Sequence, residues 1–530
     1  MQAPATSTVE TPPAGDVPHN FTHRQILKVL SGILLCIFLA AIDQTVVIPA
    51  VPAIAADLNG FSHLAWIVSA YLLTSTAMTP IYGKLSDIYG RRKLLLIALA
   101  IFALASALCA ISTSLGQLIA ARALQGIGGA GLMAMAQASI ADVVSPRERG
   151  RYQVFMASTW GVASTAGPII GGWATEALSW RWIFWINLPI ALIAIILCDR
   201  ALRLLKTPVR KARIDWWGAA LLTAAVSAWL LVLTWGGVEL PWTSPVILGL
   251  GAAGLVLVLI LRVQQRRFPD PLLPPHLFAN AVFVRGVTIA FFAALGLFGG
   301  TFLLPLFFQL VWGVDAAASG MLVVPFLASS CVGAWYAGRI ARQRGRMKGA
   351  MVAGLAGSVV GFLLLALVDA GTPMALVVLF QLLLGFAMGM VMPSSMVTVQ
   401  NAAEHRDIGS ATGCLLFLRS MGGAFGSTLV GTVLTASFAS RLLGLGITAK
   451  IDLGEVHHGG GALANVPAAL QSQVQVALSG AFHIAFLACA VGMAIAVVVA
   501  LGMRDLPLRE RINSPRTPGA RPAGLASPGD

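Results

Sequence analysis

Long apolar runs fill most of the chain and are separated by short polar breaks. Each run approaches the roughly 20 residues that a helix needs to cross a hydrocarbon core about 30 Å thick. In lipid the backbone must satisfy its own hydrogen bonds, and these runs lack the alternation of β-barrel strands. The pattern therefore predicts an all-α integral membrane protein with fourteen transmembrane helices. The expected helices are residues 28–52, 64–83, 94–113, 115–141, 152–175, 180–198, 216–235, 243–261, 284–311, 317–338, 349–369, 373–400, 409–437 and 478–502.

Composition agrees with a membrane protein, because 57% of the 530 residues are hydrophobic and 11% are charged, against a usual charged share of about a quarter. The net charge of +14 would suit a nucleic-acid partner, but the basic residues gather in the termini and in every second loop. Of 35 Lys and Arg residues, only Arg181, Arg441 and Lys450 fall in the alternate loops. This asymmetry predicts that both termini are cytoplasmic and that no nucleic acid is bound. We expect a multi-pass protein of the cell membrane, the bacterial inner membrane.

An internal repeat divides the chain. The segment "GKLSDIYGRRK" from Gly83 recurs as "GRIARQRGRMK" from Gly338, and "RERG" from Arg147 recurs as "RDIG" from Arg406. Two six-helix halves in parallel repeat, with the substrate at their interface, are a known plan for secondary transporters. The expected organisation is a disordered cytoplasmic tail, a six-helix half, two inserted helices with their loops, a second six-helix half and a second disordered tail, over residues 1–25, 26–199, 200–283, 284–504 and 505–530.

Asp43 is the one acidic residue of 21 that lies deep inside an apolar run, in "LAAIDQTVVIPAV". A charge at that depth costs roughly 2.5–3.5 kcal/mol, so it is seldom structural alone. At 1.5 Å per residue, Asp43 and Arg122 both lie about 20 Å from the cytoplasmic face, so we expect them to pair. Low dielectric favours a neutral acid whereas a guanidinium favours the ionised form, so such a pair suits proton coupling. The alternative is a static ion pair between two helices.

The segment after the second apolar run contains Gly83, Asp87, Gly90 and Arg91. The glycines suit a tight turn and close backbone approach, and Asp87 suits an Arg or a helix N-terminus as partner. We interpret these four residues as a conformational latch, with ordinary topogenic charge as the alternative. Asp87 corresponds to Arg342 in the repeat, so the charged machinery is concentrated in the first half.

The fifth apolar run contains "GPIIGG". Small residues and a proline in one helix permit close helix approach and a kink, and the residues here are Gly167, Pro168, Gly171 and Gly172. Generic membrane packing is the alternative explanation for these residues.

A further set of residues is a candidate lining for a substrate cavity. Met repacks around varied ligands, although it more often fills a helix interface. Arg419 lies near mid-membrane, and Gln381 stands where the first half has Arg122. The candidates are Gln125, Gln381, Met388, Met392 and Arg419.

Several motifs point away from enzymes and cofactors. The glycines of "GIGGAG" from Gly126 match a dinucleotide fingerprint, but they lie inside an apolar run without the required strand. The sequence contains no phosphate-binding loop, so ATP is not the expected energy source. His457 and His458 lack further ligands at metal-binding spacing. All six cysteines lie in or beside apolar runs, so no disulfide, metal or cofactor is expected.

The ordered motifs resemble those of one family. "AIDQTVVIPAVP", "GKLSDIYGRRK", "RALQGIGGAG", "GPIIGG", "SWRWIFWINLP" and "FLRSMGGAFG" stand in the order found in the major facilitator superfamily, in transporters of the fourteen-span drug:proton antiporter type. The resemblance covers residues 25 to 510 and implies an exporter, since the family's "GPIIGG" motif marks exporters. It also implies the coupling role of Asp43 and Arg122 and the latch.

The resulting expectation is a proton-coupled antiporter that exports hydrophobic or amphipathic small molecules by alternating access. Its partners are the substrate, protons and the lipid bilayer, and the sequence says nothing of a periplasmic adaptor. The alternatives are a dedicated exporter of one metabolite, such as a siderophore or an antibiotic, and a membrane sensor or scaffold that transports nothing.

Overall fold

The computed structural model describes residues 23–58, 65–203, 214–237, 240–444 and 468–509. Within these ranges the chain is helical, and an isolated bridge between Gly236 and Leu240 is its only β contact. Most of the two predicted tails and the pair His457–His458 lie outside the described residues. The elements are α1 (His23–Val46), η1 (Ile48–Ala50), α2 (Val51–Leu58), α3 (Ala65–Tyr89), α4 (Arg91–Ala110), α5 (Leu115–Val143), α6 (Pro146–Ala177), α7 (Trp182–Trp185), α8 (Asn187–Leu202), α9 (Trp216–Trp235), α10 (Pro245–Arg267), α11 (Pro275–Ala279), α12 (Ala281–Leu310), α13 (Ala316–Arg344), α14 (Lys348–Leu365), α15 (Met374–Ala402), η3 (His405–Asp407), α16 (Ile408–Gly444) and α18 (Ala468–Leu501).

Twelve helical segments of the described chain are long and apolar enough to cross a membrane. Helices α3 and α6 have 25 and 32 residues, so they are long enough, but their more polar composition leaves them outside this set. Both pack along apolar helices, α3 against α5 and α6 against α1. The prediction of an all-helical membrane protein is therefore confirmed.

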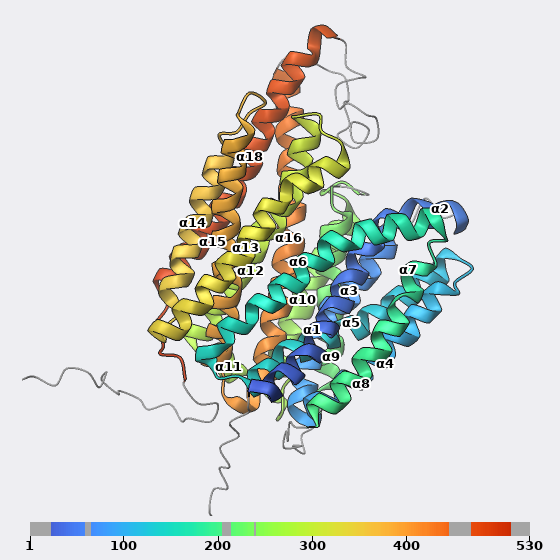
Figure 1. Cartoon of the computed structure of the whole chain (residues 1–530), viewed down its shortest axis with the longest axis vertical. Coiled ribbons are helices and arrows are strands. Elements are labelled where there is room, and N and C mark those ends of the chain that lie inside the picture. Colours follow the sequence, from blue (N-terminus) through green and yellow to red (C-terminus); the bar gives the residue numbers. More distant parts are fainter. Residues whose placement is uncertain (1–22, 59–64, 204–213, 238–239, 445–467, 510–530) are drawn as a thin grey trace, which may run out of the picture.

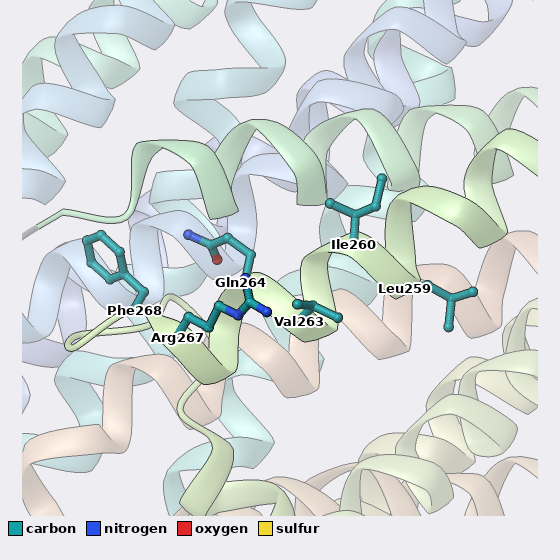
Figure 2. Close-up of a pocket in the computed structure, with 6 residues that line it drawn as sticks. All are labelled: Leu259, Ile260, Val263, Gln264, Arg267 and Phe268. Atoms are coloured by element: carbon teal, nitrogen blue, oxygen red, sulfur yellow. The ribbon is translucent and has the colours of Figure 1, made fainter.

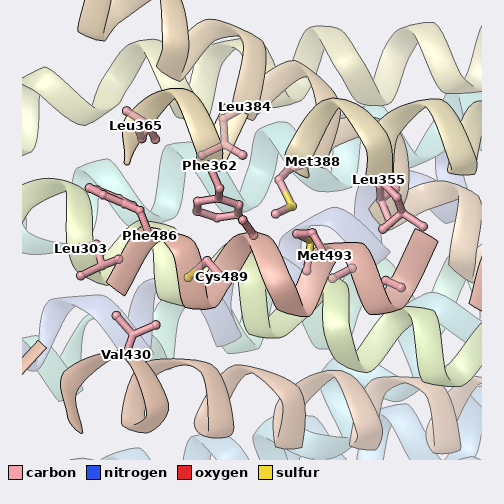
Figure 3. Packing of buried hydrophobic residues seen from close by; sticks show 14 of the residues in the cluster. Leu303, Leu355, Phe362, Leu365, Leu384, Met388, Val430, Phe486, Cys489 and Met493 are labelled. Atoms are coloured by element: carbon pink, nitrogen blue, oxygen red, sulfur yellow. The ribbon is translucent and has the colours of Figure 1, made fainter. Parts of the chain in front are cut away.

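The helices form two bundles, with α9 and α10 packed beside them (Figure 1). Helices α1 to α8 pack on one another, as do α12 to α18. The largest cluster of buried apolar side chains belongs to the second bundle, and Met388 lies inside it beside Phe362 and Met493 (Figure 3). Met388 is 1% exposed. Met388 therefore fills the core of that bundle. This is the second of the two interpretations given above, and Met388 does not line a cavity.

The two bundles approach most closely at one end, which we call the closed end. A Cβ placed on Gly83 of α3 would lie 2.5 Å from the carbonyl oxygen of Gly409 of α16. One placed on Gly150 of α6 would lie 2.6 Å from the Cα of Gly338 of α13. Since Gly338 and Gly409 are the repeat counterparts of Gly83 and Gly150, the two contacts are equivalent. From this end the bundles spread apart toward α2 and the start of α18 (Figure 1).

Several expected boundaries differ from the structure. Gly83 lies within α3, which continues to Tyr89 because helical hydrogen bonding persists after the apolar stretch ends. Only Gly90, with φ of 86°, makes the turn. Residues 505–509 were expected to be part of a disordered tail, yet the Leu508 amide donates to the Gly345 carbonyl at 2.8 Å. The last helix, α18, begins at Ala468, ten residues before the predicted start at 478.

The small residues of "GPIIGG" bring α6 against α1. A Cβ on Gly167 would overlap the Thr45 hydroxyl, and one on Gly171 would overlap the Val46 carbonyl. Thr45 also donates to the Ala163 carbonyl at 3.1 Å across the same pair of helices. A Cβ on Gly172, by contrast, would meet nothing within 4 Å. The close approach thus depends on two of the three glycines.

We predict that Gly167→Leu destabilises the protein by about 1–3 kcal/mol, because a side chain there forces α6 away from α1. Gly172→Leu is the matched control in the same motif and should leave stability nearly unchanged. Thermal unfolding of the two purified variants in one detergent measures the difference. Equal melting temperatures would show that the small residues are incidental to this packing.

Candidate functional site

The described chain buries one carboxylate and one guanidinium together in the middle of the first bundle. Asp43 of α1 is 0% exposed and Arg122 of α5 is 1% exposed. Their Oδ2 and Nη1 atoms are 2.7 Å apart. The other carboxylate oxygen, Oδ1, accepts from Gln125 Nε2 and from Asn187 Nδ2, each at 2.8 Å. The pairing expected from depth along the two helices is therefore confirmed.

Arg122 is held on every side. Its Nε donates to the Ile67 carbonyl at 3.1 Å, and its Nη1 donates to Gln125 Oε1 at 2.6 Å. Its guanidinium carbon lies 4.5 Å from the centre of the Tyr71 ring and 5.8 Å from that of Phe184. The aromatic faces attract the cation and exclude water from it. The pair therefore combines high burial with nearly complete hydrogen bonding.

Two polar atoms around this pair have no hydrogen-bond partner among the described residues: the amide oxygen of Asn187 and the hydroxyl of Tyr71. Gln125 is different, because its oxygen accepts from Arg122 and its nitrogen donates to Asp43 and to Ser106. Rotating the Gln125 amide would break these bonds. Rotating the Asn187 amide would instead present an unused acceptor to Asp43.

Sequence analysis did not single out Asn187, although it lies in the quoted motif "SWRWIFWINLP". The available signal was an amide in an otherwise apolar run, and buried amides usually serve a polar partner. Asn187 is 0% exposed and stands at the first residue of α8. The contact with Asp43 joins α8 to α1, which spacing along the chain alone does not predict.

A second group of charges lies at the closed end. The Asp87 carboxylate accepts from the backbone amides of Gly409 and Ser410 at 2.9 and 2.8 Å, and from the Ser410 hydroxyl at 2.9 Å. These amides belong to the first turn of α16, where unpaired N–H groups and the helix dipole attract an anion. Asp87 of the first bundle thus caps a helix of the second.

Arg91 connects this cap to the first bundle. It lies 2.8 Å from Asp87 and 2.9 Å from Asp142 at the end of α5. The turn at Gly90 places Arg91 at the start of α4, within reach of both carboxylates. All three side chains are at most 7% exposed. Gly83, Asp87, Gly90 and Arg91 therefore meet in one contact region between the bundles.

At the repeat-related contact between α6 and α13, arginine side chains donate to carbonyl and amide oxygens. Arg147 Nε donates to the Arg342 carbonyl at 3.0 Å. Arg149, which is 2% exposed, donates to the carbonyls of Val144 and Ala141 at 2.8 and 2.5 Å, and to Gln400 Oε1 at 3.3 Å. Sequence analysis did not single out Arg149, which connects α6 to α15 of the second bundle through Gln400.

The remaining candidate cavity residues are dispersed. Gln125 belongs to the Asp43 group, and Met392 packs beside the core of the second bundle. Gln381 is 0% exposed, and neither polar atom of its amide has a partner in the described chain. Arg419 of α16 is partly exposed and donates to the Met392 carbonyl at 3.1 Å.

Two surface grooves lie apart from these residues. One runs along α10 and is lined by Leu259, Ile260, Val263, Gln264, Arg267 and Phe268 (Figure 2). The other, at the junction of α6 with α7 and α8, is lined by apolar side chains that include Trp173 and Trp182. Neither includes Asp43 or Arg419. We therefore place the candidate site at the buried pair and not in a groove.

Comparison with known proteins agrees with this architecture. Residues 33–427 match the Major Facilitator Superfamily. The chain is 36% identical over 404 residues to the "Multidrug transporter protein MdtP" of Bacillus subtilis (strain 168), covering 76% of this chain and 74% of that protein. It is 35% identical over 430 residues to the "MFS-type efflux pump LUC4" of Fusarium sp, covering 79% and 76%.

Among solved structures, the fold resembles that of the human organic anion transporter MFSD10 (TETRAN), with a TM-score of 0.57. The identity is 17%, and the match covers 90% of this chain and 99% of that chain. These matches confirm the family indicated by the sequence motifs: the chain belongs to the Major Facilitator Superfamily, a family of membrane transporters.

Proposed function

We propose that this protein is a proton-coupled antiporter that exports small hydrophobic or amphipathic molecules. The observation that carries the proposal is the buried pair of Asp43 and Arg122. A buried ion pair seldom adds net stability compared with apolar side chains, so a functional reason for keeping it is favoured. The relatives named multidrug transporter and efflux pump support export as the direction.

We further propose that α3 and α6 also cross the membrane, which gives fourteen spans with α9 and α10 inserted between two six-helix halves. The basic residues Arg92, Arg342 and Arg344 all lie at the closed end, at the ends of α4 and α13. By the positive-inside rule this end is cytoplasmic, as are both termini. The arrangement is then closed to the cytoplasm and open outward, in the bacterial inner membrane.

The proton step uses the spare oxygen of Asn187. When Asp43 is ionised, Asn187 Nδ2 and Gln125 Nε2 both donate to Oδ1. A protonated Asp43 needs an acceptor for its O–H, and rotation of the Asn187 amide supplies one while Gln125 stays fixed. Protonation weakens the attraction between Asp43 and Arg122 and so loosens α1 from α5. Proton release restores the pair.

The closed end supplies the conformational gate. Opening to the cytoplasm requires Asp87 to leave the first turn of α16 and the glycine contacts to separate. Bundles packed at such contacts have two discrete arrangements, so a change at one site can bias the whole assembly. Proton binding at Asp43 and substrate binding between the bundles would act on this one equilibrium.

The deciding variant is Asp43→Asn. We expect it to abolish export against a substrate gradient while leaving folding and downhill exchange, because the amide mimics a permanently protonated acid. The control is Asp57→Asn, at a carboxylate that is 47% exposed and paired with Arg181. The measurement is substrate movement in proteoliposomes, with and without an imposed pH difference. A panel of unrelated compounds separates export of many substrates from export of one.

A static role for the pair predicts a different result. Asp43→Asn would then cost about 3–5 kcal/mol of stability, because Arg122 remains buried without its counter-charge. Adding Arg122→Gln, the residue type found at Gln381, would restore both stability and export. Undiminished proton-driven export by Asp43→Asn, or its recovery in the double variant, would reject proton coupling at this site.

The gate makes its own prediction. Gly83→Val should slow turnover by roughly tenfold or more while changing substrate affinity little, because it obstructs closure and not binding. Gly116→Val is the control, since a Cβ there meets nothing within 4 Å. Transport rate and equilibrium binding, measured on the same preparation, separate the two effects. A normal rate would mean that the glycine contact does not limit the cycle.

Orientation is tested by labelling from one side. In a variant without native cysteines, Arg344→Cys should react with a membrane-impermeant maleimide only after the cells are opened. Gly371→Cys, in the exposed turn between α14 and α15, should react in intact cells. The reverse result would invert the proposed topology and make the arrangement open inward.

A further inference from the structure

Arg419 is a cation that has no anionic partner among the described residues. It lies eleven residues into α16, about 16 Å from the start of that helix. Its Nε has no hydrogen-bond partner in the described chain, and its Nη2 contacts only the Met392 carbonyl. No ion pair among the described residues includes it. Because a charge at membrane depth is costly unless it is paired, a partly exposed guanidinium with one acceptor in the described chain favours an external anion.

A layer of polar side chains between the bundles locates Arg419 along α16. Gln153 of α6 donates to Gln137 Oε1 of α5 at 3.2 Å. Gln400 of α15 donates to the Gln137 carbonyl at 3.4 Å and to the Thr412 hydroxyl of α16 at 3.1 Å. This layer joins the two bundles across their interface. Arg419 follows Thr412 by seven residues, so it lies on the same face of α16, about 10 Å farther from the closed end.

The first bundle presents an aromatic side chain at the related position. Trp160 follows Gln153 by seven residues on α6, as Arg419 follows Thr412 on α16. The repeat that relates Gly150 to Gly409 also relates Trp160 to Arg419. Trp160 is partly exposed and packs with Ala41 and Ile42, the two residues before Asp43. Helical spacing thus puts a cation on α16 and an indole on α6 at equivalent positions, two turns beyond the polar layer.

We propose that Arg419 binds an anionic group of the substrate and that Trp160 contacts its apolar body, so that the transported molecules are amphipathic organic anions. This inference rests on the proposed transport function. Arg suits the task because its planar guanidinium binds oxyanions with paired hydrogen bonds. Trp supplies a large apolar face for a ring or chain. Because Trp160 packs against Ala41 and Ile42, a substrate bound at Trp160 would lie beside α1, the helix that carries Asp43.

The experiment compares two probes with the same ring and opposite charge. The full-length protein in nanodiscs is titrated with radiolabelled 2-naphthoate and with 2-naphthyltrimethylammonium, in the absence of any gradient. We expect the anion to bind roughly tenfold more tightly or better. Arg419→Gln should remove that preference, Arg419→Lys should retain part of it, and Trp160→Ala should weaken binding of the anion.

The control is Arg339→Gln, at an exposed position of α13, which should leave both affinities unchanged. Equal or tighter binding of the cation by the unmodified protein, or no binding of the anion, overturns the proposal without any variant having to fold. So does an unchanged anion affinity in Arg419→Gln. Failure of proton-driven export with intact anion preference would reject proton coupling alone, because this binding assay uses no gradient.

Discussion

The approach of backbone to backbone at the closed end is the constraint on which the rest of the structure depends. Helices can meet at such short separation where a glycine leaves room for the neighbouring backbone, and between the bundles glycine faces glycine at two such contacts. Because the two contacts are related by the repeat, the bundles close on each other about an approximate two-fold axis. The contacts of Asp87 and Arg147 across the interface lie at this same end.

The two glycine contacts are related by the repeat, but the charged residues beside them differ. On one side Asp87 caps the first turn of α16, whereas on the other side Arg147 donates to the carbonyl of Arg342. A cap formed by an ionised group is the stronger of the two interactions, so the two sides resist separation unequally. The same division holds deeper in the protein, where the first bundle contains a complete ion pair and the second an Arg alone.

Much of this was predictable from sequence. The length of the apolar runs, together with the positions of the basic residues, predicted a helical membrane protein. The similar distances of Asp43 and Arg122 from the predicted cytoplasmic face predicted that these two residues pair. The repeat related Gly83 to Gly338, but it could not show that Gly83 packs against Gly409 and Gly338 against Gly150. Contacts such as Asn187 with Asp43 join segments 144 residues apart, which one sequence does not relate. Helix ends also differed, since a helix such as α3 extends beyond its apolar stretch.

The placement of α9 has a consequence for lipids. This helix packs against both α3 and α16, one from each bundle, and its side chains share an apolar cluster with Ala77 and Met421. On that side the seam between the bundles is covered, and separating them there means sliding α9 along at least one neighbour. In the described chain α6 and α13 also pack directly on each other, and α9 shows no comparable packing against them. The two flanks of the interface are therefore unequal toward the surrounding lipid, because α9 packs over the flank formed by α3 and α16.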